Sequence, residues 1–259
     1  MRIHQSNLGR SRRAQDLLFQ TIRENEIDLA VVAEPYRISD ATDWTGDTDE
    51  MVAVTWTAAF AHGVPLERGN GYIAVQFAGM VHRVAQLYQF SAFEEFLDAV
   101  VDCVRRHLLR QVLVLGDFNA HSTKWGNPRT NERGHSLSDW ATGLWLLLVN
   151  RGSVSTCVAG RGCYIVDITW ASPDAFRRIS GWRVAEGVEI LSDHLYILME
   201  AGETPRPRMV SAGDGRGPSR AGRARPPPRW KVKEKNEDLL RAAAIATAWN
   251  WDASATTTT

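Results

Sequence analysis

The sequence predicts an α/β protein in which two mixed β-sheets pack face to face with helices outside, a four-layer sandwich. Up to about Glu200, short β-rich runs alternate with amphipathic stretches of helical spacing. The strand runs outnumber the helical ones, and long connections separate them, which suits two packed sheets better than one parallel sheet. With 259 residues, of which 44% are apolar, the chain can fill a sizeable core.

Periodicity predicts the individual elements. Residues 11–26 place Ala14, Leu17, Leu18 and Ile22 on one helix face, residues 93–109 carry a second apolar stripe, and residues 137–150 are expected to form a third helix. The expected strands lie within residues 27–36, 51–56, 71–77, 81–90, 111–119, 164–172, 181–187 and 195–201.

Composition divides the chain into three parts. Residues 1–202 form the expected domain. Residues 203–228 hold six of the ten prolines among Gly, Ser and Arg, which predicts a disordered basic linker, and residues 229–259 regain helical spacing. The zero net charge hides an asymmetry, because residues 206–259 carry +6 and residues 1–205 carry −6.

Two classes of environment are disfavoured by the sequence. Three irregularly spaced cysteines make neither a disulfide framework nor a zinc cluster, which favours a reducing compartment. No apolar run approaches the roughly 20 residues that a membrane span needs. We therefore expect an intracellular protein without membrane partners; the sequence gives no signal for an oligomeric state.

Polar side chains recur at the ends of the apolar runs. They are Glu34, Asp117, Asn119, Asp167, Asp193 and His194. Each alone has an ordinary alternative: Glu34-Pro35 is a common turn, "GDFN" can close a strand, and Asp193-His194 can form a cap or a surface turn. Together they suggest one cluster, because a buried carboxylate is costly unless it is paired, hydrogen-bonded or bound to metal.

Carboxylates, an amide and an imidazole without a Cys or Ser nucleophile are typical of metal-assisted hydrolysis of phosphate esters. A hard divalent ion such as Mg²⁺, with Mn²⁺ as the alternative, prefers oxygen ligands and neutralises charge on a phosphoryl oxygen. A second carboxylate can deprotonate or orient water, while an imidazole stabilises or protonates the phosphate.

Five motifs stand in the order found in the endonuclease/exonuclease/phosphatase superfamily, whose fold is DNase I-like. They are "QSNLGRS", "VVAEPY", "LGDFNAHSTKWGN", "VDITWAS" and "LSDHLYI". Over roughly Met1 to Ala201 the chain resembles the apurinic-endonuclease-like domain at the N-terminus of proteins from non-LTR retrotransposons, particularly the insect rDNA-targeting type. The segment "PPRWKVKEKNEDLLRAA" is similar to the one that leads toward a reverse transcriptase, so we expect the chain to be the front piece of such a protein.

The resemblance implies a role for each matched residue. Asn7 would help to hold the metal or the substrate phosphate, Glu34 would be the principal metal-ligating carboxylate, and Asp193 would lie near the metal. Asp117 would orient or deprotonate the attacking water, and Asn119 would hold the scissile phosphate. Asp167 would fix the ring of His194, which would contact the phosphate as its charge grows.

Two departures from the family pattern concern Tyr88 and Gly9. Tyr88 is the candidate for a phosphate-contacting phenol, but it lacks the proline step that usually follows, and a core tyrosine is the open alternative. Gly9 stands where repair relatives carry a second acid near the metal. The absence of that acid weakens the case for a repair role more than it weakens the case for nuclease activity.

The resemblance implies a DNA endonuclease that nicks target DNA and leaves a 3′-hydroxyl to prime reverse transcription. DNA is then the expected partner, with element RNA bound through the missing downstream region, and the expected location is the nucleus. Two alternatives stay open: a superfamily phosphatase acting on small phosphates, and an inactive transposon remnant that only binds DNA.

Overall fold

The computed structural model describes residues 1–57, 62–77, 80–85, 93–106, 111–160 and 162–202. Within these ranges the helices are α1 (Arg12–Glu24), α2 (Phe93–Arg105), α3 (Glu132–Gly143), the short α4 (Pro173–Phe176) and the single-turn 3-10 helix η2 (Thr123–Trp125). No helix in these ranges is both long enough and apolar enough to cross a membrane.

Two six-stranded mixed sheets make up the centre of the domain. The first has the order β13 (Ile179–Val184), β14 (Ile197–Ala201), β1 (Arg2–Asn7), β2 (Leu29–Ala33), β4 (Val52–Trp56), β3 (Trp44–Gly46). The second has the order β5 (Val64–Gly69), β6 (Tyr72–Phe77), β7 (Met80–Ala85), β8 (Val112–Asp117), β12 (Asp167–Ala171), β9 (Leu147–Leu148). Strands β10 (Cys157–Ala159) and β11 (Gly162–Tyr164) form a separate hairpin.

Each sheet contains one parallel pair among antiparallel ones. Strand β1 runs parallel to β2, and β7 runs parallel to β8. The remaining neighbours within the two sheets pair antiparallel. Because α1 connects β1 to β2 and α2 connects β7 to β8, each parallel pair has the crossover helix that such a connection requires.

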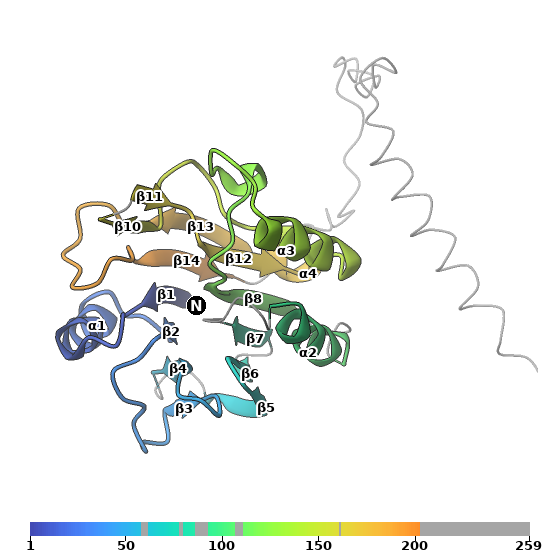
Figure 1. The fold of residues 1–259 in the computed structure, drawn as a ribbon. Helices are drawn as coiled ribbons and strands as arrows, with labels where there is room; N and C mark the ends of the chain where they lie inside the picture. Colours follow the sequence, from blue (N-terminus) through green and yellow to red (C-terminus); the bar gives the residue numbers. More distant parts are fainter. Residues whose placement is uncertain (58–61, 78–79, 86–92, 107–110, 161, 203–259) are drawn as a thin grey trace, which may run out of the picture. The chain divides into compact units, whose positions relative to one another are not determined.

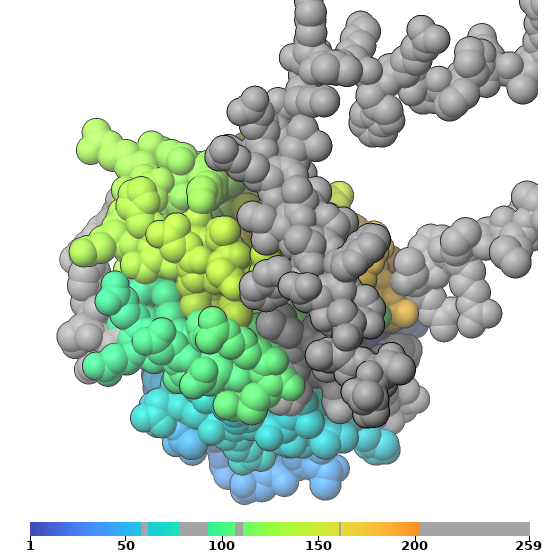
Figure 2. Space-filling view, turned by 90° about the vertical axis from the view of Figure 1, so that its right-hand side faces the viewer, coloured from blue at the N-terminus to red at the C-terminus, as the bar shows by residue number. Residues whose placement is uncertain are grey.

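The two sheets and the helices form four layers, as the sequence predicts (Figure 1). Successive side chains of β2 point to opposite faces of the first sheet. Leu29 and Val31 pack in the core shared with the second sheet, whereas Ala30 and Val32 pack with residues of α1. Strand β8 alternates in the same way between that shared core and the core beneath α2 and α3. These two helices contact each other on the outer face of the second sheet, in green and yellow-green (Figure 2).

The expected helix over residues 137–150 is wrong in its second half. Helix α3 begins earlier, where the side chain of Asn131 accepts a hydrogen bond from the Gly134 amide, and it ends at Gly143. Trp145 has a left-handed backbone with φ of 56°, which turns the chain so that Leu147 and Leu148 pair with β12. A run of leucines fits a helix and a buried strand equally well, so tertiary pairing decides the outcome.

Candidate active site

Strand ends and the loops beside them bring six of the proposed site residues together. Asn7 ends β1 and pairs with the last residue of β2, so that Glu34 follows directly after the neighbouring strand. Asp117 ends β8 and faces Asp167, the first residue of β12, across an antiparallel ladder. The loop before β14 supplies the imidazole, and the loop after β8 supplies Asn119.

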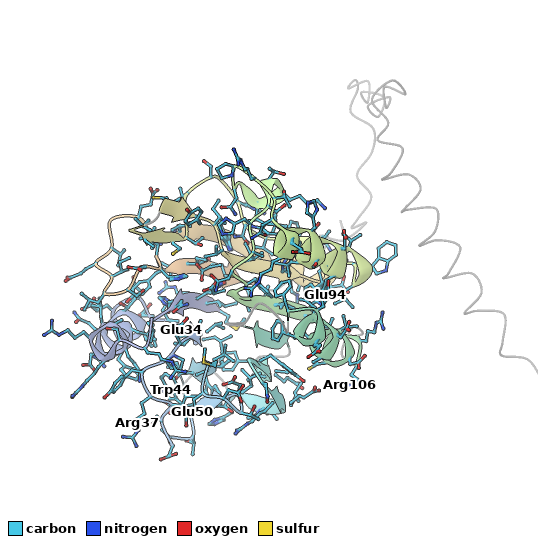
Figure 3. The ribbon with its side chains drawn as sticks, viewed as in Figure 1. Glu34, Arg37, Trp44, Glu50, Glu94 and Arg106 are labelled. Carbon is cyan, nitrogen blue, oxygen red and sulfur yellow. The ribbon has the colours of Figure 1, made fainter. Side chains whose placement is uncertain are left out.

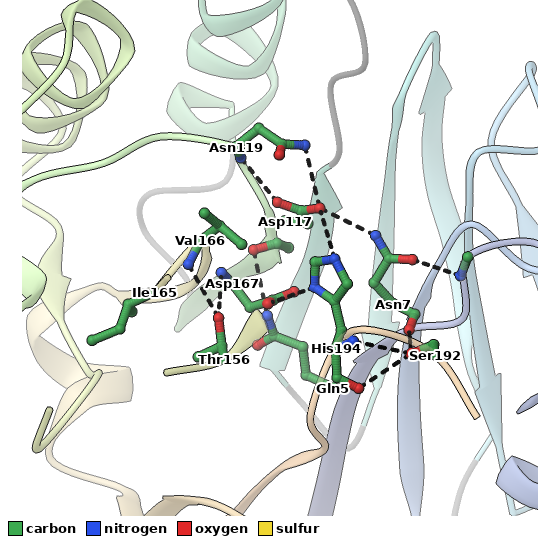
Figure 4. A network of polar contacts seen from close by, with 12 residues as sticks. Gln5, Asn7, Asp117, Asn119, Thr156, Ile165, Val166, Asp167, Ser192 and His194 are labelled. Atoms are coloured by element: carbon green, nitrogen blue, oxygen red, sulfur yellow. Dashed lines mark hydrogen bonds and ion pairs between the residues drawn. The ribbon is translucent and has the colours of Figure 1, made fainter. Parts of the chain in front are cut away.

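Asp117 is the centre of the hydrogen-bond network (Figure 4). Its carboxylate is only 2% exposed and accepts hydrogen bonds from Asn7 Nδ2 at 3.1 Å and from the Asn119 amide at 2.9 Å. Burial and the nearby Asp167 carboxylate raise the pKa of Asp117 to about 7, although His194 and the hydrogen bonds oppose the rise. The carboxyl group can therefore accept a proton near neutral pH.

His194 lies between two buried carboxylates. Its Nδ1 is 2.9 Å from Asp167 Oδ2, and its Nε2 is 3.9 Å from Asp117 Oδ2. Burial alone would lower the pKa of His194, but the charge and hydrogen bond of Asp167 and the charge of Asp117 raise it to about 12. The imidazole is therefore a cation at neutral pH, oriented by Asp167, and its Nε2 is on the side of Asp117.

Asn7 links Glu34 to this network. Asn7 Nδ2 lies 3.3 Å from Glu34 Oε1 as well as 3.1 Å from Asp117 Oδ2, and its Oδ1 accepts a hydrogen bond from the Gly9 amide. The amide of Asn7 therefore presents its NH₂ group to both carboxylates. Figure 3 shows Glu34 beside the strands of the first sheet.

Two of the clustered residues have a left-handed backbone. Glu34 and Asn119 have φ of 45° and 47°, a region that asparagine adopts more readily than glutamate does. For Glu34 this conformation costs roughly 1–2 kcal/mol and persists only where the surroundings enforce it. Strained residues gather at functional sites, so this backbone geometry supports a functional role for the Glu34 side chain.

Asp193 and Tyr88 are the two proposed site residues that do not join this network. Asp193 is exposed, its backbone carbonyl accepts a hydrogen bond from the Val158 amide, and its side chain makes no hydrogen bond or ion pair to the described residues. Tyr88 lies outside the described residues. The role of each stays a prediction.

Three further residues, which the sequence analysis does not identify, form hydrogen bonds to the backbone of the site residues. Ser192 Oγ donates to the carbonyl of Asn7 and accepts from the His194 amide, which ties the imidazole loop to β1. Thr156 Oγ1 accepts from the Asp167 amide, and Asn150 Nδ2 donates to the Asp167 carbonyl. Ser192 belongs to the motif "LSDHLYI", which could have drawn attention to it, but isolated Thr and Asn residues give no sequence signal of this kind.

The donor atoms of the cluster suit a hard divalent cation. Asp117, Asp167 and His194 each offer one ligand atom, and these atoms lie within 4.8 Å of one another, so this group could hold a metal ion. A protonated His194 cannot ligate a metal, however, because both ring nitrogens then carry protons. The carboxylate of Glu34, which Asn7 Nδ2 contacts at 3.3 Å, adds oxygen atoms of the type that Mg²⁺ prefers beside the same network.

Comparison with known proteins agrees with this architecture. Residues 80–198 match the family described as endonuclease-reverse transcriptase. The endonuclease domain of TRAS1, a telomere-specific non-LTR retrotransposon, matches with a TM-score of 0.69 and 24% identity over 77% of this chain and 97% of that one. No curated protein matches the chain significantly.

Two more distant solved structures share the fold. An AP endonuclease from Archaeoglobus fulgidus matches with a TM-score of 0.62 and 14% identity over 78% of this chain and 99% of that one. The 3′ phosphatase NExo from Neisseria, solved with a product DNA hairpin, matches with a TM-score of 0.61 and 16% identity over the same shares. The match over residues 80–198 and the shared fold agree with the resemblance that the sequence suggests, and the fold is DNase I-like.

Proposed function

We propose that this chain, with its DNase I-like fold and its match to the endonuclease-reverse transcriptase family, is a divalent-metal-dependent DNA endonuclease. It nicks target DNA and leaves a 3′-hydroxyl that primes reverse transcription of element RNA, which the part of the protein beyond this chain would bind. The observation that carries the proposal is a partly buried imidazolium, fixed by Asp167, beside a carboxylate whose pKa is raised to about 7.

The side chains divide the chemistry among them. Asp117 orients a water molecule and takes its proton as the water oxygen bonds to phosphorus. The Nε2–H of His194 donates to a non-bridging phosphate oxygen as negative charge grows there. The bond between phosphorus and the 3′-oxygen breaks, and the leaving oxygen takes up a proton to become the 3′-hydroxyl.

The remaining residues hold the substrate and the cation. Asn119 is exposed, and its side chain reaches solvent beside Asp117, where it would hold the scissile phosphate. Glu34 and Asn7 would hold Mg²⁺ or Mn²⁺, with Asp193 near it. When bound, the cation supplies charge neutralisation at the phosphate and the leaving oxygen.

A supercoiled-plasmid assay with Mg²⁺ tests the proposal. The purified chain should convert supercoiled plasmid to open circles whose 3′ ends a DNA polymerase extends without prior phosphatase treatment. His194→Ala and Asp117→Asn should each lower the nicking rate by about 100-fold or more, because they remove transition-state charge stabilisation and the base. The exposed His135 provides the control, and His135→Ala should nick like the wild type.

Other outcomes point to the competing functions. Release of phosphate from small phosphate esters without plasmid nicking would identify a phosphatase. DNA binding without either activity would identify an inactive remnant. Persistent nicking by His194→Ala would contradict the role given to that histidine. We also propose that the protein acts in the nucleus. Microscopy of a tagged full-length element protein in cells tests this location.

A further inference from the structure

Gln15 is a buried amide on the face of α1 that packs against the first sheet. It is 8% exposed and lies beside Ala14 and Leu18, which are buried apolar residues of the same helix. A buried amide needs hydrogen-bond partners, because burial removes the bonds that its polar atoms would make to water. The partners of Gln15 show what the residue does.

The side chain of Gln15 bonds the backbone of the loop that follows Glu34. Its Oε1 accepts from the Tyr36 amide at 2.8 Å and from the Arg37 amide at 3.1 Å, and its Nε2 donates to the Arg37 carbonyl at 2.8 Å. The side-chain amide of Gln15 therefore provides hydrogen-bond partners for two N–H groups and one carbonyl of this loop. Figure 3 labels Glu34 and, farther out on the same loop, Arg37.

The loop must be held because it begins in a strained conformation. Glu34 has φ of 45°, and its own peptide groups are fixed by hydrogen bonds from the Glu34 amide to the Met51 carbonyl at 2.8 Å and from the Arg10 amide to the Glu34 carbonyl at 2.9 Å. Pro35 follows and is buried. Gln15 then fixes the two residues after Pro35, so the backbone is held on both sides of the proline.

We propose that Gln15 is a positioning residue for the Glu34 carboxylate. By holding the loop at Tyr36 and Arg37, it keeps Glu34 in the left-handed conformation that places Oε1 3.3 Å from Asn7 Nδ2. The inference rests on the proposed function, in which Glu34 holds the divalent cation. Without Gln15 the loop relaxes, and the carboxylate no longer remains where the cation binds.

Binding of Mn²⁺ to the full chain without DNA, measured by electron paramagnetic resonance of the free ion, tests this directly. Gln15→Leu keeps the side-chain volume and removes all three hydrogen bonds, and it should raise the Kd for Mn²⁺ about tenfold. In the nicking assay it should raise the metal concentration for half-maximal rate more than it lowers the rate at saturating metal. Glu34→Gln is the reference and should weaken Mn²⁺ binding at least as much.

Two variants of the same helix serve as controls. Thr21→Val removes a buried hydroxyl that donates to the Leu17 carbonyl and does not touch the loop, so it should lower the thermal midpoint and leave the Kd unchanged. Gln20→Leu makes the same substitution at an exposed position. If Gln15→Leu does not fold, Gln15→Met replaces it, because the flexible thioether fills the same space and again removes the bonds to Tyr36 and Arg37; it should raise the Kd in the same way.

The outcomes separate this inference from the proposed function. If Glu34→Gln weakens Mn²⁺ binding while Gln15→Leu binds as the wild type does, the positioning role is overturned and the metal assignment stands. An equal loss of binding in Thr21→Val and Gln15→Leu would also overturn it, because general destabilisation would then explain both. If Glu34→Gln binds Mn²⁺ like the wild type, the metal assignment and this inference fail together.

Discussion

His4, which is buried, and His194, which is partly buried, have pKa values that are shifted in opposite directions. His194 is next to Asp167 and Asp117, and their charges raise its pKa to about 12 despite its burial. His4 is fully buried on β1, packs edge-on against the ring of Tyr196, and has no hydrogen-bond partner at either ring nitrogen among the described residues. Burial therefore lowers the pKa of His4 to about 3 and keeps it neutral.

The neutral state of His4 predicts acid sensitivity of the fold. Since its pKa is about 3 when folded and about 6.5 when unfolded, the unfolded chain binds the extra proton, and stability is lost as the pH falls below about 6.5. The loss is about 1.4 kcal/mol per pH unit, or about 2 kcal/mol between pH 7 and pH 5. His4→Phe should remove that part of the pH dependence, measured by urea unfolding at both pH values. His135→Phe, at an exposed position, should retain it; equal pH dependence of wild type and His4→Phe would contradict the assignment.

Among the single elements, α1 ends in a turn that its sequence does not favour. The Ile27 amide donates to the Ile22 carbonyl at 3.0 Å, a helix-ending bond that requires a left-handed residue before Ile27. That residue is Glu26, with φ of 51°, at a position where glycine is the usual choice. The side chains of Glu26 and Arg2 form an ion pair, but both are exposed, so the pair contributes little to the free energy of unfolding.

Replacing Glu26 with glycine should therefore stabilise the domain. Glycine adopts the left-handed conformation without a Cβ penalty, and we expect a gain of about 0.5–1 kcal/mol in the free energy of unfolding. Glu26→Ala is the matched control, because it loses the same ion pair and keeps the left-handed strain, so it should give no gain. Chemical denaturation of the two variants measures the difference. Equal stability of Gly and Ala at this position would show that the turn is not strained.

Along the chain as a whole, charge is divided between an acidic body and a basic end. Residues 1–205 carry −6 and residues 206–259 carry +6, with ten Lys/Arg within residues 206–235. An acidic body repels DNA at long range, whereas cations that contact phosphates release counterions and strengthen binding. We propose that the residues after Gly202 are a basic linker leading toward a downstream region, and that they supply much of the non-specific attraction to DNA.

Truncation after Gly202 tests the contribution of the basic end. It should weaken duplex binding and flatten the dependence of log Kd on log salt, by about 0.9 for each phosphate that the shorter chain no longer neutralises. The metal-dependent nicking rate at saturating DNA should stay the same, because the clustered site residues all precede the cut. Binding titrations between 50 and 200 mM salt, roughly the range over which such contacts matter, give the slope. The same affinity and slope in the truncated chain would show that the tail is only a spacer.

Much of the fold follows from local pattern in the sequence. Apolar spacing locates α1 and α2, and the runs around Val31 and Val114 locate strands whose two faces are both buried. Local pattern does not predict strand β1, because its buried residues include His4, Gln5 and Ser6, which are typical of a polar segment. Local pattern also fails at residues 144–150, where pairing with β12 outweighs the helical preference of the leucines.

The chemical types of the site can be read from the order of residues alone: carboxylates, amides and one imidazole at the ends of apolar runs, in the order of a phosphodiesterase family. Which of them meet depends on the folded chain. Asn7 reaches Asp117 across 110 positions, and Asp167 lies opposite Asp117 because β8 and β12 pair in one particular register. Strand order, register and burial arise from contacts between distant segments, which no local pattern encodes. For that reason His4 and His194 are the same residue type in the sequence, but their surroundings make the first neutral and the second a cation.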